Sequence, residues 1–532
     1  MSLWKLRVGV ESYYLAQIAS GLDEYYTGAG EAPGRWTGTG SPLLGLDGEV
    51  AGDDLRAVLA GLAPNTALTP NGAPLTSHAR RVPGFDLTFA VPKSVSTVYA
   101  LGDPLVQAAV MDACEAALTE AMGWLEREAC FVRRGTNNRA MATDPAGFGT
   151  RRMIGEGFVA AQFRHRTSRL GDPHLHWHVL VANMARGIDG RWTALDGSAL
   201  YRSRRTVGVL FQSAMRRELT MRLGVEWGPM HNDSAEIAGI PTRLLREFSQ
   251  RHEQIAEWLE AAGRSGPAAE GQALLATRTA KQHVDDFATI EAGWRARAEQ
   301  LGWGPTELDR LLAAAPDLPA AEGEQWVIRS TTSVRGDPVT VARSVGFDDW
   351  LQWLLDVRVT EKTGTFTRFD LTQAVAANLP AGTPLATMEA TVQRALASPT
   401  VVQVGDHWSE RRPVHAPGRT ITDDRELRYT SQSLLAIEER LLIQLRERAN
   451  TAVGVLDRAA VDTAIATSTL GDDQAAALRV LATAGDGVAV MVGRAGTGKT
   501  HTLGTLRQVY EHAGWTVIGL APSARAAREL QD

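Results

Sequence analysis

The sequence is poor in cysteine and contains no long apolar run. Only Cys114 and Cys130 occur in 532 residues, too few for a disulfide framework, which predicts a reducing, cytoplasmic setting. No apolar stretch reaches the roughly 18 residues of a membrane span, so no membrane insertion is expected. The first residues, MSLWKLRVGVESYY, lack the apolar run of a secretory signal.

Lysine is absent from one long segment that is otherwise strongly basic. Residues 131–222 contain sixteen arginines and six acidic residues, a local charge of +10 in a chain whose net charge is −6. Such a segment is typical of a surface that binds the phosphate backbone of DNA or RNA. A solvated arginine-rich surface is the alternative interpretation.

The apolar pattern changes along the chain. Residues 104–129 follow helical spacing after a proline start, whereas residues 155–169 and 174–186 have the character of strands on either side of a turn. Strands separated by a long helix predict an α+β domain with an antiparallel sheet. We expect three parts, namely an α+β domain at residues 1–305, a mixed helical connector at 306–450 and part of an α/β domain at 451–532.

A histidine cluster is the first candidate site. In a strand, His174, His176 and His178 would share one face, because residues two apart point the same way. His165, on the neighbouring strand, would supply a third ligand for one metal ion. Three nitrogen ligands leave open coordination positions, as in a catalytic metal site. A surface histidine pair or a structural site is the alternative. Imidazole ligands favour zinc or nickel, whereas phosphate chemistry favours magnesium or manganese.

Charged residues around these histidines are candidates for DNA contacts and for catalysis. Arginine's planar fork suits phosphate, and the DNA-binding candidates are Arg164, Arg166, Arg169 and Lys93. Asp86 lies in an apolar predicted strand, where an unpaired carboxylate is costly. Its partner would be a ligand histidine or a tyrosine hydroxyl, or else Arg80 or Arg81.

Two tyrosine pairs near the N-terminus are candidate nucleophiles: Tyr13-Tyr14 and Tyr25-Tyr26. A tyrosine hydroxyl, with a pKa of about 10, is a poor nucleophile at neutral pH. A metal ion that polarises a phosphate makes its attack feasible. Together with the histidines, the tyrosines indicate an enzyme that cuts and rejoins nucleic acid through a tyrosyl phosphate. Plain aromatic packing is the alternative.

Three segments carry a family resemblance: SYY…EYY, RVPGFDLTFAVPKSVS and FRHRTSR…DPHLHWHVLVAN. In combination they resemble the relaxase domain of MobF-type conjugative relaxases, the TrwC/TraI family of HUH endonucleases, over about residues 1–305. The resemblance implies an antiparallel-sheet palm that nicks single-stranded DNA at a plasmid origin of transfer. It also implies relaxosome proteins and a coupling protein as further partners.

The resemblance assigns roles to the candidate residues. Tyr13 would make the initial cut and Tyr25 would act in the later strand transfer, with Tyr14 and Tyr26 as accessory candidates. The pairs lie 12 residues apart, a wider spacing than the family pattern. The implied metal ligands are His165, His176 and His178, with Asp86 as the acid beside them. His174 matches no ligand of the family.

A phosphate-binding motif lies near the end of the sequence. Residues 493–500, GRAGTGKT, fit the motif G-x-x-x-x-G-K-[ST]. The apolar runs 488–492 and 516–523 on either side of it predict two strands joined by a helix, a strand–helix–strand unit. Backbone N–H groups would hold the phosphates of ATP, with Lys499 on the outer phosphates and Thr500 on Mg. Gln474 resembles the adenine-reading glutamine of RecD-like superfamily 1 helicases. The nucleotide-binding candidates are Gln474, Gly493, Gly496, Gly498, Lys499 and Thr500.

The RecA-like part is expected to be partial. The sequence continues for only 33 residues after Lys499 and contains no acidic Walker B segment and no second RecA-like domain. We therefore expect a fragment or a natural truncation without useful helicase activity. Two alternatives to a relaxase stay open. One is a DNA- and ATP-binding module with a degenerate relaxase site, and the other is a metal-dependent nuclease in which water attacks.

Overall fold

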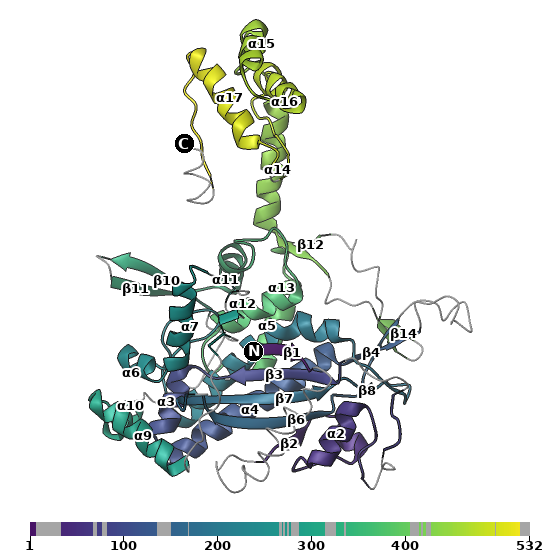
Figure 1. The fold of residues 1–532 in the computed structure, drawn as a ribbon, viewed down its shortest axis with the longest axis vertical. Coiled ribbons are helices and arrows are strands. Elements are labelled where there is room, and N and C mark those ends of the chain that lie inside the picture. The colour runs from purple at the N-terminus through teal and green to yellow at the C-terminus, as the bar shows by residue number, and fades with distance from the viewer. Residues whose placement is uncertain are drawn as a thin grey trace. The chain divides into compact units, whose positions relative to one another are not determined.

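The structure is a computed structural model that divides into two compact units, Met1–Ser431 and Gln432–Asp532 (Figure 1). It describes the whole chain except residues 7–32, 67–71, 77–81, 136–150, 169, 265, 267–268, 270–271, 274–275, 278–286, 314–325, 335–336, 405–413, 417–418, 422–426, 495 and 522–532. Among the described helices, none combines the length and the apolar character needed to cross a membrane.

A five-stranded sheet forms the centre of the first unit, with the strand order β1-β3-β7-β6-β2. Each neighbouring pair is antiparallel, which confirms the predicted α+β fold. The strands are β1 (Ser2–Lys5), β2 (Arg35–Thr37), β3 (Gly84–Ala90), β6 (Ala160–Thr167) and β7 (Pro173–Ala182). The long hairpin β6–β7 carries all four histidines of the predicted cluster.

The two faces of the sheet are packed differently. Leu175, Trp177 and Val179 of β7 point to one face and are fully buried in the main hydrophobic core, which α4 (Pro104–Ala129) and α5 (Gly197–Leu223) share. The opposite face holds Leu180 and Phe163, in a smaller core shared with α2 (Gly52–Ala60). The histidines extend from this second face.

Helix α4 begins and ends at the predicted residues. Asp103 caps its first turn, because its side chain accepts a hydrogen bond of 2.8 Å from the backbone N–H of Val106. Pro104 takes the first helical position, where its missing N–H has no helical partner in any case. The strand predicted around Asp86 is β3, and α3 (Lys93–Leu101) follows it after Pro92.

The main core of the first unit continues beyond residue 305, because Trp326, Trp350 and Tyr429 belong to the same cluster as Trp177. The predicted boundaries at 305/306 and 450/451 stay predictions. The remaining elements of this unit are β4 (Phe131–Arg134), β5 (Arg151–Ile154), β8 (Ala185–Arg186), β9 (Trp192–Thr193), α6 (Thr242–Glu247), α7 (Gln250–Ala261), α9 (Phe287–Gln300), α10 (Pro305–Ala313), β10 (Trp326–Val334), β11 (Asp337–Val345), α11 (Phe347–Leu354), a π-helical turn (Leu355–Val359), α12 (Arg368–Asn378), α13 (Leu385–Leu396), β12 (Val401–Gln403), β13 (Val414–Ala416), β14 (Arg419–Ile421) and β15 (Tyr429–Ser431).

The described part of the second unit is helical. Its elements are α14 (Gln432–Glu447), α15 (Arg458–Thr467), α16 (Asp472–Thr483) and α17 (Lys499–His512), around a small core that includes Val461, Leu478 and Val509.

The strand–helix–strand prediction for the second unit was wrong in its strands. Residues 488–492 and the described part of 516–523 form no strand, and Val492 and Leu520 are 92% and 89% exposed. The physical reason is that a parallel strand buries its apolar side chains only when neighbouring strands and helices cover both faces. The described residues of this unit supply no such cover. Only the helix of the predicted unit forms, as α17.

Candidate metal centre and nucleotide loop

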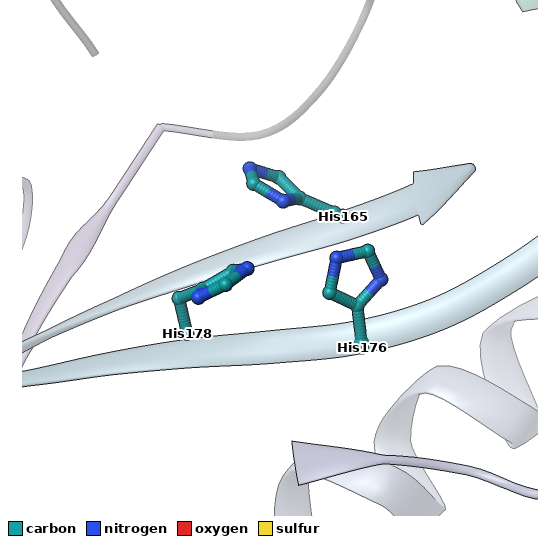
Figure 2. A group of neighbouring side chains, drawn as sticks. All are labelled: His165, His176 and His178. Carbon is teal, nitrogen blue, oxygen red and sulfur yellow. The ribbon is translucent and has the colours of Figure 1, made fainter. Parts of the chain in front are cut away.

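Three histidines converge on the second face of the sheet. His165 of β6 lies directly opposite His176 of β7 in the antiparallel register, and His178 follows two residues later on the same face. One ring nitrogen from each of the three lies within 4.8 Å of the other two, and Figure 2 shows the three rings turned toward a common point. A β-bulge between His165 and Thr167 interrupts the pairing next to the cluster. Bulges re-aim side chains and are frequent beside active sites.

Hydrogen bonds orient two of these rings. The Nδ1 atom of His176 lies 2.9 Å from the backbone oxygen of His174, and Nδ1 of His178 lies 2.9 and 3.0 Å from the two carboxylate oxygens of Asp86. Because these oxygens accept hydrogen bonds, Nδ1 carries the proton in both rings and Nε2 keeps its lone pair. This is the arrangement that metal-binding histidines usually have. The donor set therefore suits a divalent ion with open coordination positions.

Asp86 was predicted to need a partner, and the structure gives it His178. The side chain of Asp86 is only 3% exposed, and its strand β3 pairs with β7 so that Thr88 lies opposite His178. Asp86 therefore points from the face that carries the histidines. Arg80 and Arg81, the alternative partners, lie outside the described residues.

His174 is stacked on His176, with ring centroids 4.7 Å apart, and is not among the three residues that could share a metal ion. Burial, with the nearby charges of His176, Lys93 and His178, lowers the pKa of His174 to about 3. His174 is therefore neutral at physiological pH and packs beside the cluster.

The predicted phosphate-contacting arginines point away from the histidines. Arg164 lies opposite Trp177 in the β6–β7 register, on the face covered by α4, and its guanidinium donates a 3.1 Å hydrogen bond to Glu115. Arg166 is buried, with its guanidinium 3.3 Å from the centroid of the Phe287 ring. These two arginines therefore lie on the face opposite the histidines, and their contact with phosphate stays a prediction. The pleat is the reason, because residues that alternate with His165 face the opposite side.

Lys93 and Arg169 complete the set of predicted DNA contacts. Lys93 is partly buried at the start of α3 and donates a 2.8 Å hydrogen bond to the backbone oxygen of Pro173. Burial lowers the pKa of Lys93 to about 8, while Asp172 and Glu236 oppose that shift. The geometry gives Lys93 a bond within the protein. Arg169 lies outside the described residues.

The positive charge of the basic segment 131–222 is partly offset by ion pairs, which involve eight of its sixteen arginines among the described residues. Its arginines pair with carboxylates both inside the segment, such as Asp196, and outside it, such as Glu120. The paired arginines are Arg133, Arg134, Arg152, Arg164, Arg186, Arg205, Arg217 and Arg222. The surplus of positive charge in the sequence therefore does not translate into an equally basic surface.

The nucleotide-binding candidates come together in the second unit. Gly496 and Gly498 both have positive φ, 81° and 74°, a backbone conformation that favours glycine. Lys499 begins α17 and donates 2.8 Å hydrogen bonds to the backbone oxygens of Gly493 and Arg494.

Gln474 contacts the same loop. Its side-chain amide donates a 2.9 Å hydrogen bond to the backbone oxygen of Thr497, and a Cβ on Gly498 would lie 2.3 Å from the amide nitrogen of Gln474. Thr500 is exposed on the first turn of α17. Gln474 and the loop are therefore neighbours, as the helicase resemblance implies.

Comparison with known proteins identifies the family. The family model described as TrwC relaxase matches residues 8–301, more than half of the chain. The chain belongs to the TrwC relaxase family. A second model, described as an AAA domain, matches residues 469–532 and includes the phosphate-binding motif.

Individual relatives agree with this assignment. The multifunctional conjugation protein TraI of Escherichia coli is 30% identical to this chain over 314 residues, and that of strain K12 is 29% identical over 296 residues. These matches cover 55% and 53% of this chain but only 16% and 15% of the TraI proteins.

Solved structures of the conjugative relaxase TrwC in complex with oriT DNA are also similar. A metal-free structure is 29% identical with a TM-score of 0.46, and a metal-bound structure is 28% identical with a TM-score of 0.47. Each covers 57% of this chain and 98% of its own.

Two residues outside the predicted set belong to the same sheet or hairpin as the histidines. Asp172, at the β6–β7 turn, is buried and paired with Arg297 of α9, and Trp4 of β1 is 62% exposed. The sequence held no signal for Trp4, because Trp4 and Lys5 are both exposed after the buried Leu3 and the short strand shows no regular alternation. The pairing of Asp172 with Arg297 spans 125 residues and has no local signal. All four predicted tyrosines, Tyr13, Tyr14, Tyr25 and Tyr26, lie outside the described residues.

Proposed function

We propose that this chain nicks one DNA strand at a plasmid origin of transfer and later rejoins it, as a conjugative relaxase. The observation that carries the proposal is the convergence of His165, His176 and His178, with Asp86 bonded to His178, inside the segment that matches the TrwC relaxase model. The identity to TraI, described as a conjugation protein, supports the same activity over the part that it covers.

Tyr13 is the proposed first nucleophile. Its phenolic oxygen attacks the scissile phosphorus, the bond from phosphorus to the 3′-oxygen breaks, and that oxygen leaves with a proton as a free 3′-hydroxyl. The product is a 5′-phosphate ester on Tyr13, which retains the bond energy, so that a 3′-hydroxyl can reverse the step. Tyr25 would act in that second transfer, with Tyr14 and Tyr26 as accessory candidates.

The histidine cluster would hold a divalent ion through Nε2 of His176, Nε2 of His178 and one nitrogen of His165. When bound, the ion supplies positive charge next to the non-bridging oxygens of the scissile phosphate. Magnesium or manganese suits the phosphate, whereas zinc or nickel suits the imidazoles. Asp86 keeps the proton of His178 on Nδ1, and the backbone oxygen of His174 does the same for His176, so both rings present their lone pairs.

Trp4 is the proposed stacking surface for a DNA base near the cut. Trp4 lies opposite Asp86 in the β1–β3 register, so its side chain is on the face that carries the histidines. Strands are about 4.8 Å apart, which places Trp4 roughly 10 Å across the sheet from β7, within reach of nucleotides next to the scissile phosphate. β1 is an edge strand, and 62% of Trp4 is exposed. Stacking on an exposed aromatic ring supports single-stranded DNA binding without arginine contacts.

The loop at residues 493–500 is proposed to bind ATP with Mg. Lys499 would exchange its bonds to the backbone oxygens of Gly493 and Arg494 for bonds to the outer phosphates, and Thr500 would contact Mg. Gln474, which is bonded to the loop, would read the base. We further propose a cytoplasmic location, which suits the two free, buried thiols, and association with relaxosome and coupling proteins.

The ends of the cleaved DNA test this proposal. Single-stranded oligonucleotides tiled across candidate origin-of-transfer DNA are incubated with the full chain and Mg or Mn. We expect one fragment with a 3′-hydroxyl that a polymerase extends and one whose 5′ end is blocked until protease digestion leaves only a peptide on it. A free 5′-phosphate without protease would instead identify a nuclease in which water attacks, and the tyrosine mechanism would be rejected.

A further inference from the structure

Hydrogen bonds and an ion pair connect the turn between β6 and β7 to helices that are distant in the sequence. Asp172 in this turn has a side chain only 1% exposed, and it accepts a 3.0 Å hydrogen bond from Arg297 of α9. Its second carboxylate oxygen accepts a 3.1 Å bond from the backbone N–H of Gln250 at the start of α7. Arg297 is itself held by Glu247, through bonds of 2.9 Å to the carboxylate and 2.6 Å to the backbone oxygen.

Two further bonds hold the backbone of the same turn. The indole N–H of Trp294 donates a 2.7 Å hydrogen bond to the backbone oxygen of Gly171, and the ammonium group of Lys93 donates a 2.8 Å bond to that of Pro173. Three consecutive residues of the turn are thus tied to α3, α7 and α9. Such a set of long-range bonds is more than a two-strand turn needs to form.

The turn joins the two strands that carry the metal-binding histidines. Pro173 precedes His176 by three residues, and Thr167, where the strand pairing resumes after the bulge, follows His165 by two. A shift of the turn therefore changes the spacing between His165 and His176, which face each other across the hairpin. Metal sites are sensitive to such shifts, because ligands must be held within about 0.5 Å of the productive geometry.

We propose that Asp172 and Arg297 are positioning residues for the metal centre. Their ion pair, with the bonds from Trp294 and Lys93, fixes the end of the β6–β7 hairpin and so sets the distance between His165 and His176. Neither residue contacts the metal. The inference deepens the proposed function, since it rests on the metal site at the three histidines.

Loss of one partner has a defined physical consequence. Without Arg297, the Asp172 carboxylate stays buried and loses its ion-pair partner, which favours movement of the turn toward solvent. Replacement of Asp172 by asparagine keeps the shape but removes the charge, so the bonds from Arg297 and Gln250 weaken. Both changes leave the three histidines and Asp86 in place.

The test is a titration of the full chain with Mn²⁺ in the absence of nucleotide, read by calorimetry and by electron paramagnetic resonance of free Mn²⁺. His165→Ala serves as the blank for binding outside the cluster. We expect Arg297→Met and Asp172→Asn to bind Mn²⁺ about 10- to 100-fold more weakly than wild type, the range found for residues that orient metal ligands. Arg297→Lys, which keeps the charge, should recover part of the affinity.

Matched variants separate positioning from general destabilisation. Arg310→Met removes an exposed ion pair with Glu307 on the neighbouring helix α10 and should leave Mn²⁺ affinity unchanged. Trp294→Phe removes the bond to Gly171 and part of a buried ring that packs on Phe287, and it should weaken binding in a chain that still folds, as thermal melting would verify. If wild type binds Mn²⁺ tightly and the Arg297, Asp172 and Trp294 variants bind it equally tightly, the positioning role is overturned while the metal site stands. Wild-type binding no tighter than the His165→Ala blank would overturn the metal site and this inference together.

Discussion

Replacement of Asp86 by asparagine is expected to weaken metal binding at the three histidines by about tenfold, toward the low end of the range for residues that orient metal ligands. Asp86 is 3% exposed and bonds Nδ1 of His178 through both carboxylate oxygens, at 2.9 and 3.0 Å. Asparagine keeps one accepting oxygen and the shape of the side chain, so the ring orientation survives while the negative charge is lost. A tenfold loss corresponds to about 1.4 kcal/mol of binding free energy.

Alanine at position 86 removes both accepting oxygens and should therefore cost more, up to about 100-fold in affinity or roughly 2.7 kcal/mol. The assay is calorimetric titration with Mn²⁺ at a temperature where circular dichroism shows each variant folded. The order wild type, Asp86→Asn, Asp86→Ala in decreasing affinity supports the argument. Equal affinity in all three proteins would refute it, because the Asp86–His178 bond would then have no influence on the lone pair that binds the metal.

The remaining predictions concern DNA, acid stability and nucleotide. Trp4→Leu should weaken binding of a fluorescent single-stranded 20-mer, measured by anisotropy, by about 1–3 kcal/mol, the value of one base stack, whereas Trp515→Leu, another exposed tryptophan, should not; equal effects would reject the stacking role. Hydrogen bonds from Arg134 lower the pKa of Asp189 to about 2. The ion pair therefore stabilises the fold above the unfolded pKa of about 4, and this stabilisation is lost as the pH falls toward 2. Its size is below about 1 kcal/mol, because the pair is exposed. The difference in unfolding free energy between wild type and Asp189→Asn should therefore disappear between about pH 4 and pH 2 in acid-melting curves. Lys499→Ala should lower the affinity for ATP in equilibrium dialysis, and unchanged affinity would contradict the role given to the loop.

The sequence predicted the parts of the fold that depend on local periodicity. Helix α4 was predicted at its observed bounds because a proline start and 26 residues of apolar spacing agree, and the structure adds the Asp103 cap. The alternation of β7 placed His176 and His178 on one face, and His165, predicted on the neighbouring strand, lies beside them in the structure.

Two kinds of feature were missed: the face of the sheet on which an arginine lies, and contacts between residues far apart in the sequence. Arg164 and Arg166 alternate with His165, so the same period of two that grouped the histidines puts these arginines on the other face. Ion pairs of the basic segment such as that from Arg217 to Glu120, and the bond from Arg297 to Asp172, join residues far apart in sequence and could not be predicted from it. The apolar run 488–492 has the composition of a buried strand, but a strand forms only with partners, which composition does not supply.

The most direct test of the central claim is the covalent intermediate on Tyr13. The full chain is incubated with a single-stranded origin-of-transfer oligonucleotide and Mn²⁺ and is then run on a denaturing protein gel. The account predicts a metal-dependent band of higher mass that contains DNA, maps to Tyr13 by peptide mass spectrometry and disappears in Tyr13→Phe. Cleavage of the oligonucleotide without any such band, or a band of equal intensity in Tyr13→Phe, would contradict the tyrosine mechanism.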